Sequence, residues 1–193
     1  MVRQLAFVGP VFFSELRSPS PMQDARFLHF AGCLEAFHRE VVQADVGKFM
    51  PKSEYRALVQ SVLEQMPSTV CPELRDSMRS SLSHANSHSF SERIDALFGE
   101  LELETQIQLT KEPKRFLAAI KHSRNKLAHV SEEMPGETFE GREYAHANLC
   151  IRAWLQTLIL KRCGIPESLI RNRMAGIGYF YWGPFSFESK VGS

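Results

Sequence analysis

The sequence predicts an all-α protein, and three observations support this fold class. Apolar residues recur at spacings of three and four in several long stretches, which is the period of an amphipathic helix. Serine, proline and glycine stand at the ends of these stretches, where helices are capped or stopped. The chain has 193 residues, 44% of them hydrophobic, which suffices for one domain with a sizeable core. We expect a bundle of long antiparallel helices over residues 23–176.

The two ends of the chain are predicted to be extended arms. Residues 1–13 are rich in β-branched and aromatic side chains, and Ser-Pro-Ser-Pro follows at 18–21, so residues 1–22 read as a short strand or arm and a linker. Pro10 interrupts the apolar run that follows Arg3, and no small-residue cleavage site comes after it, which favours mature sequence over a signal peptide. Residues 177–193 form an aromatic tail.

The first half of the domain predicts three helices. Residues 23–46 carry one core face, with Glu35 and Arg39 as an exposed pair four residues apart. Residues 53–66 predict a second helix, with Ser53 as its N-cap, and residues 72–86 a third. The side chains expected to point inward from the second helix are Tyr55, Leu58, Val59, Val62 and Leu63. His84 and His88 have a spacing that could hold a metal, but no carboxylate or third ligand is nearby, so a polar loop is the preferred interpretation.

The second half predicts a short helix over residues 90–101 and a long one over residues 113–130 that begins at Pro113. An acidic loop over residues 132–141 leads to a strong helix over residues 144–163, which Gly164 stops, and to a short helix over residues 166–175. The tail is expected to pack on this subunit or on a partner, or to pair with the arm at residues 7–13. Stacking of nucleic-acid bases on its aromatic rings is the alternative.

Composition limits the classes of function. Lysine and arginine number 23 against 22 aspartates and glutamates, so any affinity for nucleic acid must come from a local patch. The four cysteines fall singly, which argues against a zinc site and a disulfide framework and makes a reducing cytoplasm the expected location. No apolar run approaches the roughly 20 residues that span a bilayer. We expect no cofactor, no metal and no membrane contact.

The helix over residues 113–130 carries both a basic patch and a pair of reactive side chains. Between residues 111 and 126 there are six basic residues and one acid. Arg124 and His129 stand five positions apart, with Asn125 directly after the arginine. A guanidinium can stabilise a phosphoryl anion and an imidazole can move a proton near neutral pH, as RNA cleavage without a metal requires. The patch favours a polyanionic substrate, with Lys121 and Lys126 as the RNA-binding candidates, although a basic helix face is often only solvated.

The string from Arg124 to His129, in a helical chain of this size, resembles the HEPN superfamily of ribonucleases and their R-x4-6-H motif. The likeness is greatest to the ApeA-type HEPN domain of bacterial antiphage proteins and covers roughly residues 23–165. It implies a homodimeric endoribonuclease acting in defence or as a toxin, with Arg124, Asn125 and His129 as catalytic residues. ApeA-type domains usually follow a larger N-terminal region, so the resemblance leaves two interpretations of residues 1–21: the remnant of such a region, with a missing sensing domain or a regulatory partner, or the start of a short stand-alone version.

Helix geometry points to the same assembly. At about 100° per residue, five positions turn the helix by about 140° beyond a full rotation, so Arg124 and His129 do not share a face. Two copies related by a two-fold axis can bring both arginines and both histidines to one cleft. His129 lies near the helix C-terminus, where the dipole favours the charged imidazole that a general acid needs.

Two other interpretations stay open. One is a catalytically silent HEPN-like module that binds RNA or mediates assembly, in which Arg124 pairs with a carboxylate at the core edge and His129 is only a helix-end residue. The other is a structural helical protein whose aromatic tail docks another protein.

Overall fold

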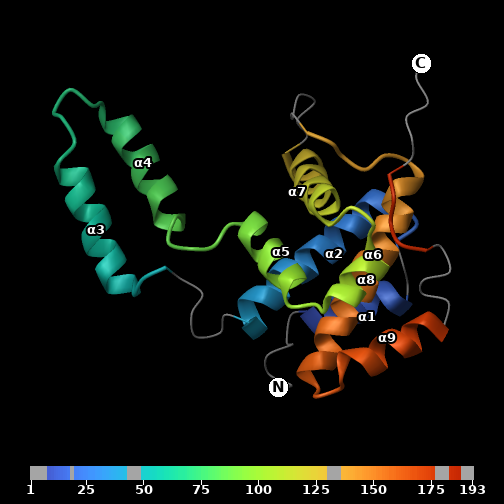
Figure 1. Ribbon diagram of the computed structural model, residues 1–193. Helices are drawn as coiled ribbons and strands as arrows, with labels where there is room; N and C mark the ends of the chain where they lie inside the picture. The colour runs from blue at the N-terminus through green and yellow to red at the C-terminus, as the bar shows by residue number, and fades with distance from the viewer. Residues whose placement is uncertain (1–7, 18–19, 43–48, 130–135, 177–182, 188–193) are drawn as a thin grey trace.

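The computed structural model describes residues 8–17, 20–42, 49–129, 136–176 and 183–187. Within these ranges the chain forms nine α-helices and a short π-helical segment, η2, and no β-sheet, so the all-α prediction is confirmed (Figure 1). The elements are α1 Val8–Arg17, α2 Gln23–Phe37, η2 His38–Val42, α3 Lys52–Glu64, α4 Pro72–His84, α5 Phe90–Gly99, α6 Leu103–Leu109, α7 Pro113–His129, α8 Arg142–Arg162 and α9 Glu167–Gly176. No helix in the described part is long and apolar enough to cross a membrane.

Helix α2 is the centre of the fold, because α1, α5, α7 and α8 all contact it. Its phenylalanines at positions 27, 30 and 37 are fully buried. Trp154 of α8 is also buried; its ring meets Phe98 edge-on with centroids 5.2 Å apart, and its indole N–H donates to the Leu97 carbonyl oxygen at 3.4 Å. The tryptophan therefore buries a large apolar surface and still satisfies its polar atom.

The predicted N-terminal arm is wrong over its described residues, because Val8–Arg17 is a helix. Val8 and Phe12 lie four residues apart and are buried, with the Phe12 and Phe30 rings 6.2 Å apart. Pro10 falls in the first turn, where an amide has no intrahelical acceptor to lose. Glu15 is buried too, and its carboxylate contacts the His29 ring. A single apolar face of two turns was enough to form a helix on α2.

The long helix predicted from residue 23 forms, but it changes to π-helical winding at His38. This histidine is 2% exposed, and its Nδ1 lies 3.4 Å from Nη1 of Arg93. Arg93 also donates from Nε to the His88 carbonyl oxygen at 2.9 Å. Burial, and after it the positive charge of Arg93 and the neighbouring His88, lower the pKa of His38 to about 4. His38 is therefore neutral in the folded protein at physiological pH.

This histidine makes stability depend on pH. Its pKa in the unfolded chain is about 6.5, so between pH 6.5 and 4 the unfolded chain binds a proton that the folded protein excludes. The free energy of unfolding should therefore fall as the pH drops through this window, by about 2 kcal/mol between pH 7 and 5. Urea denaturation of the wild type and of His38→Gln at pH 7 and at pH 5 measures this change in the free energy of unfolding. Replacement should remove this part of the dependence, and an equal slope in both proteins would contradict the assignment.

Helices α3 and α4 form a hairpin that stands away from the main body (Figure 1). The two helices were predicted correctly, but Leu58 and Val62 do not point into a core; they are 48% and 43% exposed. At the base of the hairpin, Asn86 accepts from the Met50 amide at 3.1 Å and donates to the Met50 carbonyl at 2.9 Å. Within the described part of the chain, the apolar side of α3 thus packs against α4 alone, and one helix is too narrow to cover all of its apolar side chains.

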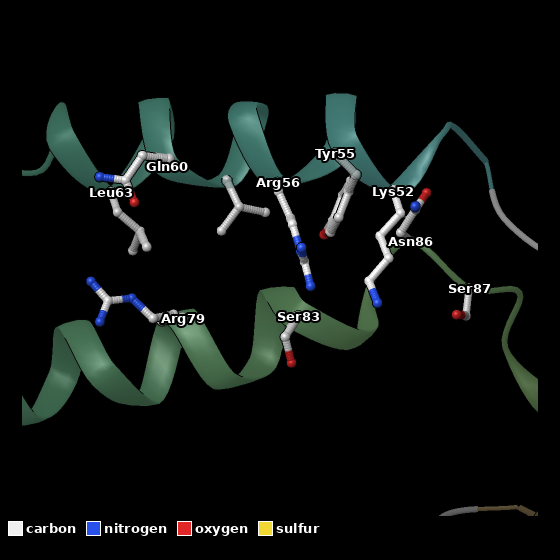
Figure 2. A pocket seen from close by; sticks show the side chains of 10 residues that line it. Lys52, Tyr55, Arg56, Gln60, Leu63, Arg79, Ser83, Asn86 and Ser87 are labelled. Atoms are coloured by element: carbon white, nitrogen blue, oxygen red, sulfur yellow. The ribbon is translucent and has the colours of Figure 1, made fainter.

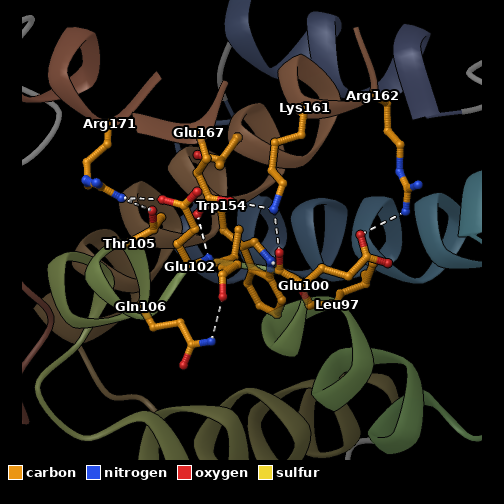
Figure 3. Close-up of polar contacts among 12 residues, drawn as sticks. Leu97, Glu100, Glu102, Thr105, Gln106, Trp154, Lys161, Arg162, Glu167 and Arg171 are labelled. Atoms are coloured by element: carbon orange, nitrogen blue, oxygen red, sulfur yellow. Dashed lines mark hydrogen bonds and ion pairs between the residues drawn. The ribbon is translucent and has the colours of Figure 1, made fainter. Parts of the chain in front are cut away.

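A polar network attaches α9 to the turn between α5 and α6 (Figure 3). Glu167 is buried, pairs with Lys161 at 2.5 Å and accepts from the Glu102 amide at 2.8 Å. Arg171 adds a contact to the Glu102 carboxylate at 2.9 Å. The buried charge of Glu167 is therefore both paired and hydrogen-bonded, as a buried carboxylate must be.

The described part of the C-terminal tail packs on its own subunit. Phe185 forms an isolated parallel β-bridge with Thr110; its amide donates to the Leu109 carbonyl at 2.8 Å, and its carbonyl accepts from the Lys111 amide at 3.1 Å. The ring is fully buried, 4.9 Å from that of Phe116. At Phe185, the prediction that the tail packs on its own subunit is confirmed. The prediction that it pairs with the N-terminal arm is wrong at this residue, because Phe185 pairs with Thr110. The aromatic residues 179–182 lie outside the described residues.

Candidate active site on helix α7

Helix α7 is held to the core by one face and presents the motif at its C-terminal end. Phe116, Ala119 and Ile120 are buried, so the predicted apolar stripe is confirmed in this part of the helix. Ser123 is also buried, and its hydroxyl accepts from the Phe139 amide at 2.8 Å. The segment leading into α8 is thereby attached to α7 one residue before Arg124.

Arg124 is held by contacts from three elements. Its Nη2 lies 3.8 Å from Oε2 of Glu35 on α2, and its guanidinium carbon lies 5.2 Å from the centre of the Phe90 ring on α5. Its Nη1 donates to Oδ1 of Asn125 at 3.3 Å. The side chain is nevertheless 33% exposed. A guanidinium in this state has a fixed place and still offers N–H groups to an anion from solvent.

Glu35 and Phe90 were not among the predicted site residues. Glu35 was predicted to pair with Arg39, but its carboxylate lies against Arg124 instead. Phe90 was assigned to a helix with no further role. A weak cation–π contact and a half-exposed ion pair contribute little to stability, roughly 1 kcal/mol or less each. Their effect is to orient the guanidinium.

The other predicted catalytic residues are placed only in part. Asn125 lies beside Arg124 and already accepts its hydrogen bond. His129 is the last residue of α7, and its side chain lies outside the described part of the structure. The helix is regular through both positions, so the predicted angle of about 140° between Arg124 and His129 holds for the backbone.

The basic patch on α7 is less positive than the sequence indicates, because several of its cations are paired with carboxylates. Arg115 lies 2.5 Å from Glu137 and 3.1 Å from Glu112. Lys121 donates to both carboxylate oxygens of Asp95, at 2.7 and 2.8 Å. Among the described residues, no carboxylate lies within 4 Å of Lys111, Lys114 or Lys126. Of the two predicted RNA-binding lysines, Lys126 therefore has no carboxylate partner among the described residues, whereas Lys121 would have to leave Asp95 to meet a phosphate.

A second histidine of α7, His122, received no role from the sequence. It lies seven residues before His129, and residues seven apart share a helix face. Its Nδ1 is buried without a hydrogen-bond partner among the described residues. Gly136 lies directly against the ring: a Cβ there would fall 2.1 Å from Nδ1, and its φ of 130° is unfavourable for other residues. Glycine is thus required where this segment meets α7.

No group of three histidine, cysteine, aspartate or glutamate side chains in the described ranges is arranged to hold a metal ion. Of the histidine pair considered above, His88 has its ring 4.4 Å from that of Phe49, and the side chain of His84 lies outside the described residues.

Comparison with known proteins places the chain beside one family of helical domains. Residues 28–169 match the family described as Apea-like HEPN. This range begins on α2 and ends on α9, and it contains both the motif helix and the α3–α4 hairpin. No curated protein and no solved structure matches the chain.

Proposed function

The chain belongs to the Apea-like HEPN family, and from this premise we propose that it is a metal-independent, RNA-specific endoribonuclease that acts as a homodimer in antiphage defence or as a toxin. One observation carries the proposal. On α7, the helix that His129 ends, the guanidinium of Arg124 is oriented by Glu35 and Phe90 yet stays open to solvent. A structural arginine at a core edge has no need of that exposure.

The proposed reaction uses the RNA as its own nucleophile. The 2′-oxygen forms a bond to the adjacent phosphorus and gives up its proton to a neutral imidazole, while the bond from phosphorus to the 5′-oxygen breaks and that oxygen takes a proton from a charged imidazole. Arg124 stabilises the extra negative charge on the phosphorane oxygens. Asn125 holds the arginine and orients it toward the phosphate. The products are a 2′,3′-cyclic phosphate and a 5′-hydroxyl.

Two histidines are needed for these two proton transfers, and the motif of one chain supplies one. A two-fold axis near the end of α7 would bring a second His129 to the same phosphate, one imidazole as base and the other as acid. Since the arginine and the histidine of one helix diverge by about 140°, a shared cleft between two copies suits the motif better than one copy does.

Cleavage of RNA in the presence of EDTA tests this function. The wild type should cut a labelled single-stranded RNA, leave the all-DNA counterpart intact because it lacks the 2′-hydroxyl, and keep its rate when EDTA is added. Mass spectrometry of the fragments should find a cyclic phosphate at each new 3′-end. Cleavage of DNA, a rate restored only by added metal, or a linear 3′-phosphate as the first product would each refute the mechanism.

The pairing of α7 cations favours a second candidate, a silent module that binds RNA or mediates assembly. Glu35 and Asp95 neutralise two of the residues that an RNA would meet. A well-folded wild type that dimerises and binds RNA without cutting any of several RNAs would support this alternative.

A further inference from the structure

The groove between α3 and α4 is lined by cations and by no carboxylate of the described residues. It has a volume of about 390 Å³. Lys52 and Arg56 reach into it from α3, and Arg79 reaches from α4 (Figure 2). Val59 and Leu63 supply apolar parts of its lining. A ligand there would meet positive charge above an apolar surface.

This separation of charge follows from the helix register. Lys52, Arg56, Val59 and Leu63 fall at positions i, i+4, i+7 and i+11 and so share one face of α3. Glu54 lies about 200° from Lys52, on the opposite face. The hairpin as a whole has as many acids as bases, but the groove holds only bases.

The cations of the groove are available to a ligand. No carboxylate among the described residues lies within 4 Å of Lys52 or Arg56, and both side chains are exposed. Arg79 has one exposed contact, 3.5 Å from Asp76. In the α7 patch, Arg115, Lys121 and Arg124 have carboxylate partners, whereas Lys111, Lys114 and Lys126 have none within 4 Å among the described residues. In a chain of net charge +1, unpaired cations that gather in one place attract an anion locally.

An exposed aromatic residue next to Asn86, which lines the groove, adds a second kind of contact. Phe49 is 58% exposed, and its amide donates to the Asn86 carbonyl at 3.4 Å. Its ring lies 4.4 Å from that of His88. Cations that follow a backbone, together with an exposed ring on which a base can stack, are the two features of single-strand binding sites.

The groove leads toward the candidate active site. Asn86 and Ser87 line its end, and Phe90, the ring under Arg124, follows within four residues. Four residues span at most about 14 Å. A strand that leaves the groove past Phe49 and His88 therefore comes close to Arg124.

We infer that the α3–α4 groove binds the backbone of single-stranded RNA, with Phe49 stacking a base, and so holds the substrate next to the cleavage motif. This rests on the proposed function, whose substrate it supplies with a binding surface. The groove is a binding site, and no catalytic step takes place in it.

Binding of a 2′-O-methyl RNA oligonucleotide tests the inference independently of cleavage, because the methyl group blocks the attacking oxygen. Fluorescence anisotropy would compare the wild type with the double variant Lys52→Gln/Arg56→Gln. The matched control, Arg17→Gln/Arg142→Gln, removes two exposed cations elsewhere on the main body. The groove variant should bind at least tenfold more weakly than the control. For the groove variant, the slope of log Kd against log salt concentration should also be smaller by about 1.4, as expected when two phosphate contacts are lost.

Phe49→Leu separates stacking from charge. It should weaken binding about tenfold and leave the salt dependence unchanged, because no cation is removed. Circular dichroism would show that each variant keeps its helices. Equal affinity of the groove variant and the control would overturn the inference, as would displacement of the oligonucleotide by poly-glutamate at the RNA's own concentration, which would identify an acidic protein partner.

The two proposals fail separately. A wild type that binds the methylated RNA through the groove but cuts no RNA would refute the nuclease and keep the groove. A groove variant that loses no affinity in an active enzyme would refute the groove and keep the nuclease.

Discussion

His129→Ala and Arg124→Ala should each lower the rate of RNA cleavage about 10³-fold or more. General acid–base catalysis contributes about 10²- to 10⁴-fold, and both proton transfers of the proposed reaction pass through His129. Removing a group that stabilises the charge of a transition state costs about 10²- to 10³-fold. In the proposed dimer each copy supplies one such residue to a shared cleft, so one substitution alters the cleft twice.

The measurement is single-turnover cleavage with saturating enzyme, so that a change in RNA affinity does not enter the rate. Lys114→Ala is the control, since it removes an exposed cation from the same helix. Glu35→Gln should fall between the control and the two catalytic variants, roughly tenfold below the wild type, because the guanidinium stays but loses its orienting charge. Unchanged cleavage by a folded His129→Ala protein would eliminate the proposed mechanism.

Phe185→Ala should lower the free energy of unfolding by about 3–5 kcal/mol, the usual cost of replacing a buried phenylalanine by alanine. Its ring is fully buried and contacts those of Phe116 and Phe139, with centroids 4.9 and 5.3 Å away. Little can move into the space that the ring leaves, because Phe116 is itself fixed on α7. The tail residue thus belongs to the core beneath the motif helix.

Urea denaturation of the wild type and the variant measures this difference. Phe13→Ala is the matched control: the same side chain is 55% exposed on α1, and its loss should cost less than about 1 kcal/mol. A small effect of Phe185→Ala would show that the tail packs loosely and would favour the interpretation in which it docks another protein.

Which helices exist could be predicted from periodicity, but what covers them could not. Helices α2, α7 and α8 were expected because their apolar faces run over many turns. The helix α1 was missed because it is short, contains Pro10 and has aromatic residues typical of a strand. Leu58 and Val62 lie on an apolar face, as predicted, yet no element in the described part of the chain covers them. Spacing identifies a face and says nothing of its neighbour.

The site divides in the same way. Arg124, Asn125 and His129 could be found because they form a short local motif on one helix. Glu35 and Phe90 could not, because they reach Arg124 only when α2 and α5 pack beside α7. Asp95 was missed for the same reason, and with it the pairing of Lys121. A local count of charges overestimates a patch when the acids that neutralise it are distant in the sequence.

The isolated position of the α3–α4 hairpin has a consequence for how the protein unfolds. Among the described residues, Leu63 is the only buried residue of α3, and α4 has none. The hairpin therefore adds little to the cooperative core around α2 and α8. A unit of this kind opens and closes at a free-energy cost of its own, well below that of global unfolding. The groove can therefore be lost transiently while the motif helix stays folded. An RNA strand bound between the two helices would shift this local equilibrium toward the closed hairpin. The free-energy cost of ordering the hairpin would make the affinity lower than the contacts alone would provide.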